Sequence, residues 1–305
     1  MRVVGAIAVF GSAIALAGTA VWGLWRTPKV NPGPVLSGGF LTLGLAILLH
    51  LAYPWFTLGY SARFTVLALS IFSGLSQVFT ALRVSSRTGR PVMFARQDWV
   101  RLLAAIVVGV VIPALAVSAP RRDVLRIKSP FSTGVWYVAQ GGGLSLVNHH
   151  FAVPAQRYSL DLVRLDGAGR SCSGPRSSLE SYPAWGSRVQ SPVSGLIVNV
   201  VDGLPDMPIG QRDVENPAGN HIVLETDDGT RLLLAHLRRG SIVVRPGTRV
   251  EPGEALAEVG NSGNTSEPHL HIQAMKPSEG DVWVGVPIAI GGRILHRGQL
   301  LQTER

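Results

Sequence analysis

Two histidines, His269 and His271, lie one residue apart in the segment "PHLHI" of this 305-residue chain. Side chains two residues apart on a β-strand project from the same face, so both imidazoles would face one space. His236 in "LLLAHL" and Asp161 in "RYSLDLV" are polar residues within other short apolar runs. Burying an unpaired carboxylate is costly, so a cation is expected near Asp161. Imidazole and carboxylate are ligands of Zn²⁺, and these residues admit either a zinc site or ordinary hydrogen-bonded side chains.

The strands that must position these side chains begin after Lys128, where the sequence changes character. Apolar runs of four to seven residues alternate there with Gly, Pro, Asn and Asp, as in "GVWYVAQ", "GLIVNVV" and "HIVLET". Short strands with turn residues at such spacing predict an all-β domain, a sandwich or a barrel, over residues 123–305. The Gly- and Ser-rich residues 165–190 predict a surface loop within it.

The first 122 residues predict an α-helical membrane region. Four charge-free apolar windows of 19 to 23 residues are each close to the length of about 20 that crosses a bilayer as a helix. The first window lacks a clear small-residue cleavage site and is followed by three more, so it is interpreted as a retained helix rather than a signal peptide. The four windows are residues 3–25, 35–56, 64–82 and 102–120.

The basic residues beside these windows predict the topology. Cytoplasmic loops are enriched in Lys and Arg, and the connection between the third and fourth windows is rich in arginine. Assigning that connection to the cytoplasm leaves both termini outside. Basic residues just after the fourth window oppose this, but a long following domain can be exported despite flanking charge. The chain is therefore expected to be a multi-pass protein of the bacterial cytoplasmic membrane with its β domain on the extracytoplasmic side.

Charge and cysteine content narrow the possible partners and ligands. The formal net charge of +9 suits an anionic partner such as phospholipid, cell-wall polymer or nucleic acid. The arginines cluster near the membrane windows rather than alternating with aromatic residues in the β domain, so no nucleic-acid partner is expected. Cys172 is the only cysteine, which excludes an intrachain disulfide and a thiolate metal cluster. A zinc site would have to use His and carboxylate ligands.

Several motifs within residues 145–290 resemble the lysostaphin/LytM-type zinc metallopeptidases, in kind and in order. The motifs are "SPVSGLI", "GNHIVLE", "AHL", the glycine spacing around Gly247 and Gly253, and "GNSGNTSEPHLH". The resemblance implies a two-sheet β fold of the duplicated-hybrid-motif kind, with a zinc site in a groove on one sheet. It also implies an enzyme that cleaves peptide bonds in bacterial peptidoglycan.

The resemblance also assigns roles to particular residues. The second His of the family's HxH motif, a metal ligand, corresponds to His271, and the metal-binding Asp corresponds to Asp161. The two catalytic histidines that do not bind metal correspond to His269 and to His236. These matches imply one Zn²⁺ per chain, with His236 and His269 orienting or deprotonating its bound water.

One position departs from the family's pattern. The usual first ligand is a His four residues before the Asp, and here Arg157, which stays protonated and cannot ligate a cation, occupies that position. His149 and His150 are the candidate replacements, because a hairpin closing near Val153 would bring them beside Asp161. Adjacent strand residues face opposite sides, so at most one of the two should enter the groove. A similar "N-x-H…Q-R-Y-A-x-D" pattern in one branch of the family favours His150.

The sequence therefore predicts a membrane-anchored zinc endopeptidase, with the lipid bilayer and peptidoglycan peptides as its partners. Arg157 favours an alternative, a metal-free member of the same fold that binds cell wall or regulates a partner hydrolase. A second alternative is a carrier domain, because "SPVSGLIVNVV" and "VEPGEALAEVG" also resemble the halves of lipoyl- or biotinyl-type domains. No modifiable lysine lies in a turn between these halves.

Overall fold

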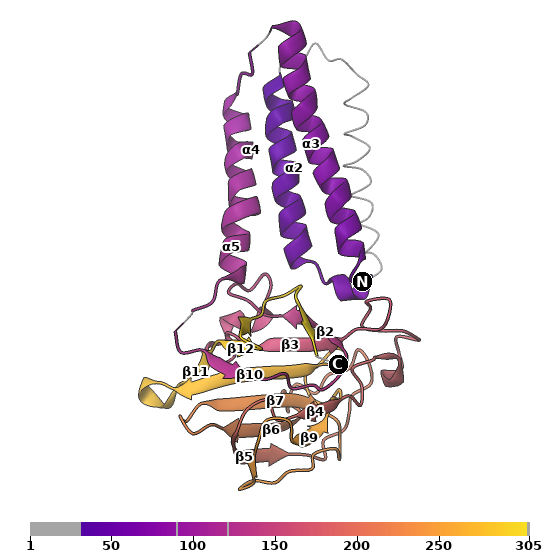
Figure 1. Cartoon of the computed structure of the whole chain (residues 1–305), viewed down its shortest axis with the longest axis vertical. Helices are drawn as coiled ribbons and strands as arrows, with labels where there is room; N and C mark the ends of the chain where they lie inside the picture. Colours follow the sequence, from indigo (N-terminus) through magenta and orange to yellow (C-terminus); the bar gives the residue numbers. More distant parts are fainter. Residues whose placement is uncertain (1–31, 90, 121, 304–305) are drawn as a thin grey trace. The chain divides into compact units, whose positions relative to one another are not determined.

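The computed structural model describes residues 32–89, 91–120 and 122–303. It divides the chain into two compact units, Met1–Leu115 and Ala116–Arg305. The regular structure in the described part of the first unit is helical, and that of the second unit consists mainly of β-strands (Figure 1).

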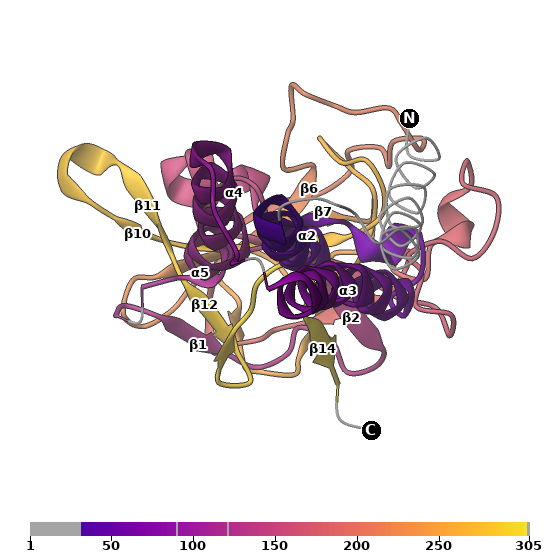
Figure 2. The ribbon, with the colours of Figure 1, turned by 90° about the horizontal axis from the view of Figure 1, so that it is seen from above.

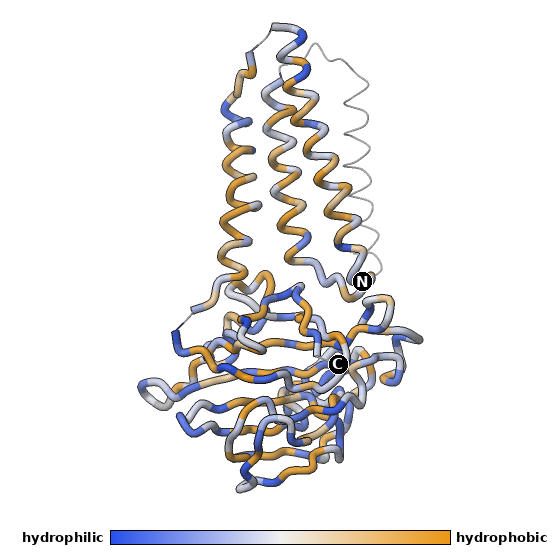
Figure 3. Tube along the Cα trace, in the orientation of Figure 1, coloured by the Kyte–Doolittle hydropathy of each residue, from blue (hydrophilic) through white to orange (hydrophobic). Residues whose placement is uncertain are grey.

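Three helical segments in the described part of the chain are long and apolar enough to cross a membrane, and apolar residues predominate along them (Figure 3). The windows predicted from residue 35 onward are therefore helical, whereas the first window, 3–25, lies outside the described residues. A π-helical turn, Val107–Val111, joins the two helices of the third segment. The helices are α2 (Pro32–Ala52), α3 (Ala62–Thr88), α4 (Arg96–Ile106) and α5 (Ile112–Val117).

Small residues allow the backbones of these helices to approach closely. A Cβ atom added to Gly39 of α2 would lie 2.9 Å from the carbonyl oxygen of Gly74 in α3. One added to Gly44 of α2 would lie 2.8 Å from the carbonyl oxygen of Ala105 in α4. Lipid tails are as apolar as the helix surfaces, so such close van der Waals packing is a main source of helix association in a membrane.

A buried carboxylate adds a polar link between α2 and α4. Asp98, whose side chain is fully buried, accepts hydrogen bonds from the Ser37 hydroxyl at 2.9 Å and from Arg101 Nη1 at 3.3 Å. Its second oxygen accepts the backbone N–H of Ala95 at 2.9 Å, which caps the first turn of α4. The carboxylate is thereby fully hydrogen-bonded, as a buried charge requires.

The second unit is mostly β-structure, as predicted. Nine strands form one sheet in the order β14–β2–β3–β10–β7–β6–β5–β8, with β11 paired to β10. The described strands form two further small sheets, β1–β12–β13 and β4–β9, so there are three sheets rather than the expected two. The strands are β1 (Leu125–Ile127), β2 (Val135–Gln140), β3 (Leu160–Arg164), β4 (Arg188–Gln190), β5 (Gly195–Val201), β6 (Asn220–Glu225), β7 (Arg231–Leu237), β8 (Arg249–Val250), β9 (Ala255–Glu258), β10 (Leu270–Pro277), β11 (Trp283–Val286), β12 (Ile288–Ile290), β13 (Arg293–Ile294) and β14 (Leu300–Gln302).

The large sheet has one apolar face and, on its central strands, one polar face. β10 lies between β3 and β7, and it extends with β11 as a hairpin past the other strands (Figure 2). Leu162, Leu270 and Leu234, one from each central strand, are fully buried in the core of this unit. Since side chains alternate along a strand, the residues between these leucines face the opposite side. That side carries the candidate site.

Substitutions at two adjacent glycines, Gly38 and Gly39, test the packing of α2. Gly39→Ala should cost about 1–3 kcal/mol of stability, because the new methyl group meets the backbone of α3. Gly38→Ala is the matched control, since its methyl group would meet only the flexible Gln77 side chain, 3.3 Å away. Thermal unfolding of the full-length chain in detergent checks both variants. Equal melting temperatures for the two variants would contradict the proposed backbone contact.

Candidate metal centre

Three neighbouring strands bring the predicted site residues to one face of the large sheet. Asp161 of β3 is paired with His271 of β10, which is in turn paired with Ala235 of β7. His269, two residues before His271, projects from the same side of the chain. The leucines and isoleucines that alternate with these residues enter the core. The i, i+2 prediction for the two histidines therefore agrees with the strand geometry.

His236 reaches the same face only because of a β-bulge. Leu234 points into the core and Ala235 to the polar face, so regular alternation would send His236 back into the core. The pairing of β6 with β7 shifts register at this point, and His236 has a φ of +63°. A positive φ is uncommon for a residue other than glycine, and bulges re-aim side chains next to functional sites. The His236 ring centroid lies 4.8 Å from that of His269 and 5.8 Å from that of His271.

The histidines that precede β3 lie on a turn and not on a strand. His149–Ala152 forms a 3₁₀-helix, and a second one, Pro154–Gln156, follows. The predicted hairpin with His149 and His150 in a strand is therefore wrong. Successive residues of a 3₁₀-helix point about 120° apart rather than to opposite sides, which allows both rings to approach Asp161.

Arg157, at the family's usual ligand position, is not part of the cluster. Its Nε atom donates to the carbonyl oxygen of Phe151 at 3.4 Å, and its guanidinium carbon lies 5.3 Å from the centroid of the Phe151 ring. Arg157 follows the second 3₁₀-helix and precedes β3. In this chain the imidazole that contacts Asp161 from this side is that of His150, which lies on the turn before β3 rather than at position 157.

The Asp161 carboxylate is the centre of the cluster. His150 Nε2 lies 3.1 Å from both carboxylate oxygens, and His271 Nδ1 lies 2.9 Å from Oδ1. His269 Nε2 is 3.7 Å from the same oxygen. Asp161 and His271 are buried and His150 is partly buried. His149 lies beside His150, with 3.8 Å between ring centroids.

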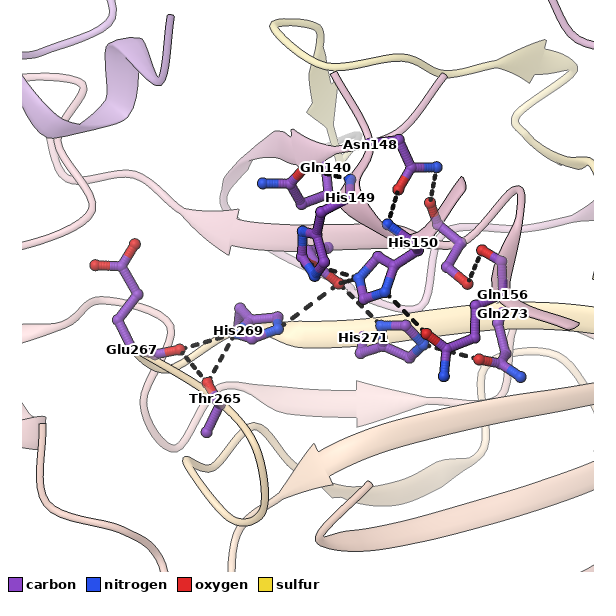
Figure 4. A network of polar contacts seen from close by, with 12 residues as sticks. Gln140, Asn148, His149, His150, Gln156, Thr265, Glu267, His269, His271 and Gln273 are labelled. Carbon is purple, nitrogen blue, oxygen red and sulfur yellow. Dashed lines mark hydrogen bonds and ion pairs between the residues drawn. The ribbon is translucent and has the colours of Figure 1, made fainter. Parts of the chain in front are cut away.

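Amide side chains hold the other ring nitrogens of the two histidines closest to Asp161. His150 Nδ1 lies 3.0 Å from Gln156 Oε1, and His271 Nε2 lies 3.0 Å from Gln273 Oε1 (Figure 4). An amide oxygen only accepts, so each of these ring nitrogens carries a hydrogen. In the neutral imidazoles the opposite nitrogens, His150 Nε2 and His271 Nδ1, then direct lone pairs at the Asp161 carboxylate.

Two lone pairs and a carboxylate repel one another unless protons or a cation lie between them. Ligand atoms around tetrahedral zinc are about 3.3 Å apart, from bonds of about 2.0–2.1 Å. The observed nitrogen–oxygen distances of 2.9 and 3.1 Å are close to that spacing. These two distances are compatible with His150, Asp161 and His271 as zinc ligands. Among the described residues, the group whose ligand atoms all lie within 4.8 Å of one another is His149, His150 and Asp161, without His271.

Backbone carbonyl groups orient the other two histidines. His236 Nδ1 donates to the Ser262 carbonyl oxygen at 2.9 Å, and His269 Nδ1 donates to that of Glu267 at 2.8 Å. The Nε2 atom of each neutral ring is then a proton acceptor. The close approach of Ser262 also explains the glycine at position 219, because a Cβ atom there would lie 2.4 Å from the Ser262 carbonyl oxygen.

The charges of the cluster shift the pKa values of its members. Burial alone would raise the pKa of the Asp161 carboxyl, but attraction to the protonated forms of His150 and His269 holds it well below the usual range. Burial lowers the pKa of His150, and the Asp161 carboxylate outweighs this and raises it. Burial, followed by repulsion from His269 and His271, sets the pKa of His236 well below its usual value. His236 is thus a neutral imidazole near pH 7.

Asn148 holds the histidine-bearing turn, a role that the sequence did not reveal. Its Oδ1 atom accepts the backbone N–H of His150 at 3.1 Å. Its Nδ2 atom donates to the carbonyl oxygens of Gly142, Arg157 and Ser159. Gln273 had a readable signal, since it continues the alternation after His271. Asn148 and Gln156 correspond to the N and the Q of the "N-x-H…Q-R-Y-A-x-D" pattern, but the pattern did not reveal their contacts, which depend on the 3₁₀ turns.

Comparison with known proteins finds a similarity over part of the sequence. The sequence model of peptidase family M23 matches residues 181–282. This segment, about a third of the chain, is therefore similar to peptidase family M23. The M23 segment contains His236, His269 and His271, whereas His150 and Asp161 precede it. No curated protein sequence matches the chain.

Several solved structures are similar to part of this chain. Lysostaphin in solution is 23% identical, with coverage of 41% of this chain and 39% of its own and a TM-score of 0.27. A zinc containing peptidase from Vibrio cholerae is 17% identical, with coverage of 60% and 38% and a TM-score of 0.28. The M23 metalloprotease pseudoalterin from the deep sea is 16% identical, with coverage of 58% and 98% and a TM-score of 0.33. The chain thus spans about two fifths of the first two proteins.

The hydrogen bonds of the Asn148 side chain are expected to keep the turn closed. Asn148→Asp replaces the donating amide by an acceptor facing three carbonyl oxygens, which should cost about 1–3 kcal/mol locally. Trypsin cleavage after Arg157 should then be roughly tenfold faster or more, because cleavage follows the population of the opened turn. The control is Asn199→Asp, at an exposed position of β5. Unchanged cleavage in Asn148→Asp would show that other contacts hold the turn.

Proposed function

We propose that this protein is a membrane-anchored zinc endopeptidase that hydrolyses peptide bonds of bacterial peptidoglycan. The observation that carries the proposal is the pair of ring nitrogens, His150 Nε2 and His271 Nδ1, directed at the Asp161 carboxylate by two amide side chains. Structural zinc sites use four protein ligands, whereas catalytic ones use three and keep one position for water or substrate. The set His150, Asp161 and His271 corresponds to the second kind.

The peptidase activity is proposed from the histidines that remain beside this set. Zinc, when bound, would lower the pKa of a coordinated water toward about 7 and polarise the scissile carbonyl group. His236 is neutral and presents Nε2, so it would accept the proton of that water. His269, oriented by Glu267, would share this role and stabilise charge that develops on the carbonyl oxygen. A protonated His236 could then return the proton to the leaving amine.

Peptidoglycan as the substrate and the cell exterior as the location follow from two separate features. The M23 segment and its motifs resemble enzymes that act on peptidoglycan. The helices α2, α3 and α4–α5 are suited to anchor the chain in the cytoplasmic membrane. An extracytoplasmic domain would meet its substrate there, and the distribution of arginines favours that orientation.

Zinc binding is the first measurable consequence. The full-length chain, purified in detergent and incubated with Zn²⁺, should contain one zinc ion per chain by elemental analysis. His150→Ala, Asp161→Ala and His271→Ala should each weaken binding by more than about 100-fold, because even residues that only orient ligands contribute 10–100-fold. His221→Ala, in β6, is the control and should retain zinc. A folded chain that takes up no zinc would contradict the proposal and favour a metal-free binding protein.

Hydrolysis tests the role of His236 separately from metal binding. Asn tolerates the positive φ at this position better than most residues, so His236→Asn removes the imidazole with little strain. The variant should keep its zinc and lose about 10²–10⁴-fold in kcat on peptidoglycan fragments, the usual contribution of a general base. His221→Asn should hydrolyse the fragments at the wild-type rate. Full activity in His236→Asn would remove His236 from the mechanism.

A further inference from the structure

Five of the eight histidines gather around Asp161, and one of them differs from the rest. Four have a ring nitrogen held by an oxygen of the protein: Gln156 for His150, Ser262 for His236, Glu267 for His269 and Gln273 for His271. The ring nitrogens of His149 form no such hydrogen bond with any described residue. Its backbone N–H alone is fixed, by Gln140 Oε1 at 3.2 Å.

His149 nevertheless lies close to two of the proposed ligands, His150 and Asp161. One ring nitrogen of His149, one of His150 and one carboxylate oxygen of Asp161 all lie within 4.8 Å of one another. The 3₁₀ turn explains how two adjacent residues can both contribute, since their side chains diverge by about 120°. His149 is the exposed member of this group, while Asp161 is buried. Its ring can therefore rotate without breaking a hydrogen bond.

A ligand whose ring is not held in place differs functionally from one that is. Residues that orient metal ligands fix the ring and its tautomer, and this keeps the ligand on the metal. His150 and His271 have such residues, Gln156 and Gln273, and so they would remain bound throughout a reaction. His149 has none, so its bond to a metal would form and break with little cost to the surrounding structure.

We propose that His149 is a displaceable fourth zinc ligand, which occupies the coordination position that substrate and water need. The proposal rests on the proposed function, because it assumes zinc on His150, Asp161 and His271. In the resting enzyme a lone pair of the His149 ring would complete a tetrahedral set of three imidazoles and one carboxylate. A substrate carbonyl oxygen or a water molecule then takes the position as the His149 nitrogen–zinc bond breaks. The neutral imidazole leaves with its lone pair, and no proton or electron has to be supplied.

This arrangement restricts catalysis until a substrate competes with His149. The apparent affinity for any ligand of the open position is reduced by the fraction of sites that are open. If about nine-tenths of the sites are closed, removal of His149 strengthens such binding by roughly tenfold. Water alone would be a weak competitor, whereas a peptide held along the groove would bring its carbonyl oxygen to the metal at high effective concentration.

The test compares the zinc-loaded full-length chain with its His149→Ala variant. Zinc K-edge X-ray absorption should show one imidazole ligand fewer in the variant. Competition with a chelator should show zinc affinity that is lower by about tenfold or more. Acetohydroxamate, a small anion that binds open zinc positions, should bind the variant roughly tenfold more tightly. A merely structural role of His149 would weaken zinc without tightening acetohydroxamate.

Controls separate this proposal from the proposed function. His221→Ala should leave all three measurements as in the wild type, and His149→Gln replaces the Ala variant if the latter fails to fold. Equal imidazole numbers in wild type and His149→Ala would overturn the displaceable ligand while leaving the zinc enzyme intact. Absence of zinc from the folded wild-type chain would instead overturn the proposed function. Loss of all zinc in His149→Ala, with zinc retained in His271→Ala, would make His149 a permanent ligand and overturn its displacement.

Discussion

The interaction between the Asp161 carboxylate and the imidazoles around it is the constraint on which the site depends. A buried carboxylate without partners would destabilise the sheet, and here His150, His269 and His271 lie within 3.7 Å of its oxygens. The three rings come from different segments: His150 lies on a 3₁₀ turn, His269 just before β10 and His271 within β10. The polar face of β3, β10 and β7 thus compensates one charge with groups that are also suited to chemistry.

The remaining features serve to aim these groups. A bulge brings His236 out of the core, and backbone carbonyls of the loop before β10 set the tautomers of His236 and His269. Strain at a positive φ costs about 1–3 kcal/mol, which the surrounding hydrogen bonds must offset. The His236 backbone N–H donates to Ala218 and its carbonyl accepts from Gly260, both at 3.0 Å. The side chains in the core behind the sheet need no such strained backbone, because the regular alternation of the strands already points them inward.

Sequence reasoning succeeded where periodicity controls structure. The three apolar windows that lie within the described residues are helical, and His269 and His271 both approach Asp161, as their alternation predicted. It failed where a few backbone angles decide the outcome. His149 and His150 were placed on a strand because "VNHHF" is compatible with one, but Asn148 holds the residues after it in a 3₁₀ turn. The bulge at His236 could not be predicted either, since the segment "LLLAHL" is indistinguishable in sequence from a regular strand. The motif singled out His236 as a candidate but did not explain how its ring comes to lie beside those of His269 and His271.

The separation of Asp161 and His271 along the chain has a consequence for folding. The two residues are 110 positions apart, and β10 is the strand that enters between β3 and β7. Contacts of such long range form late, because loop closure is entropically costly before it is rewarded. An ion held by both residues can therefore bind only a chain whose central sheet is already closed. Its binding free energy would add to the stability of that state alone. Metal uptake would thus report completed folding, and a nascent or partly unfolded chain would lack a working site.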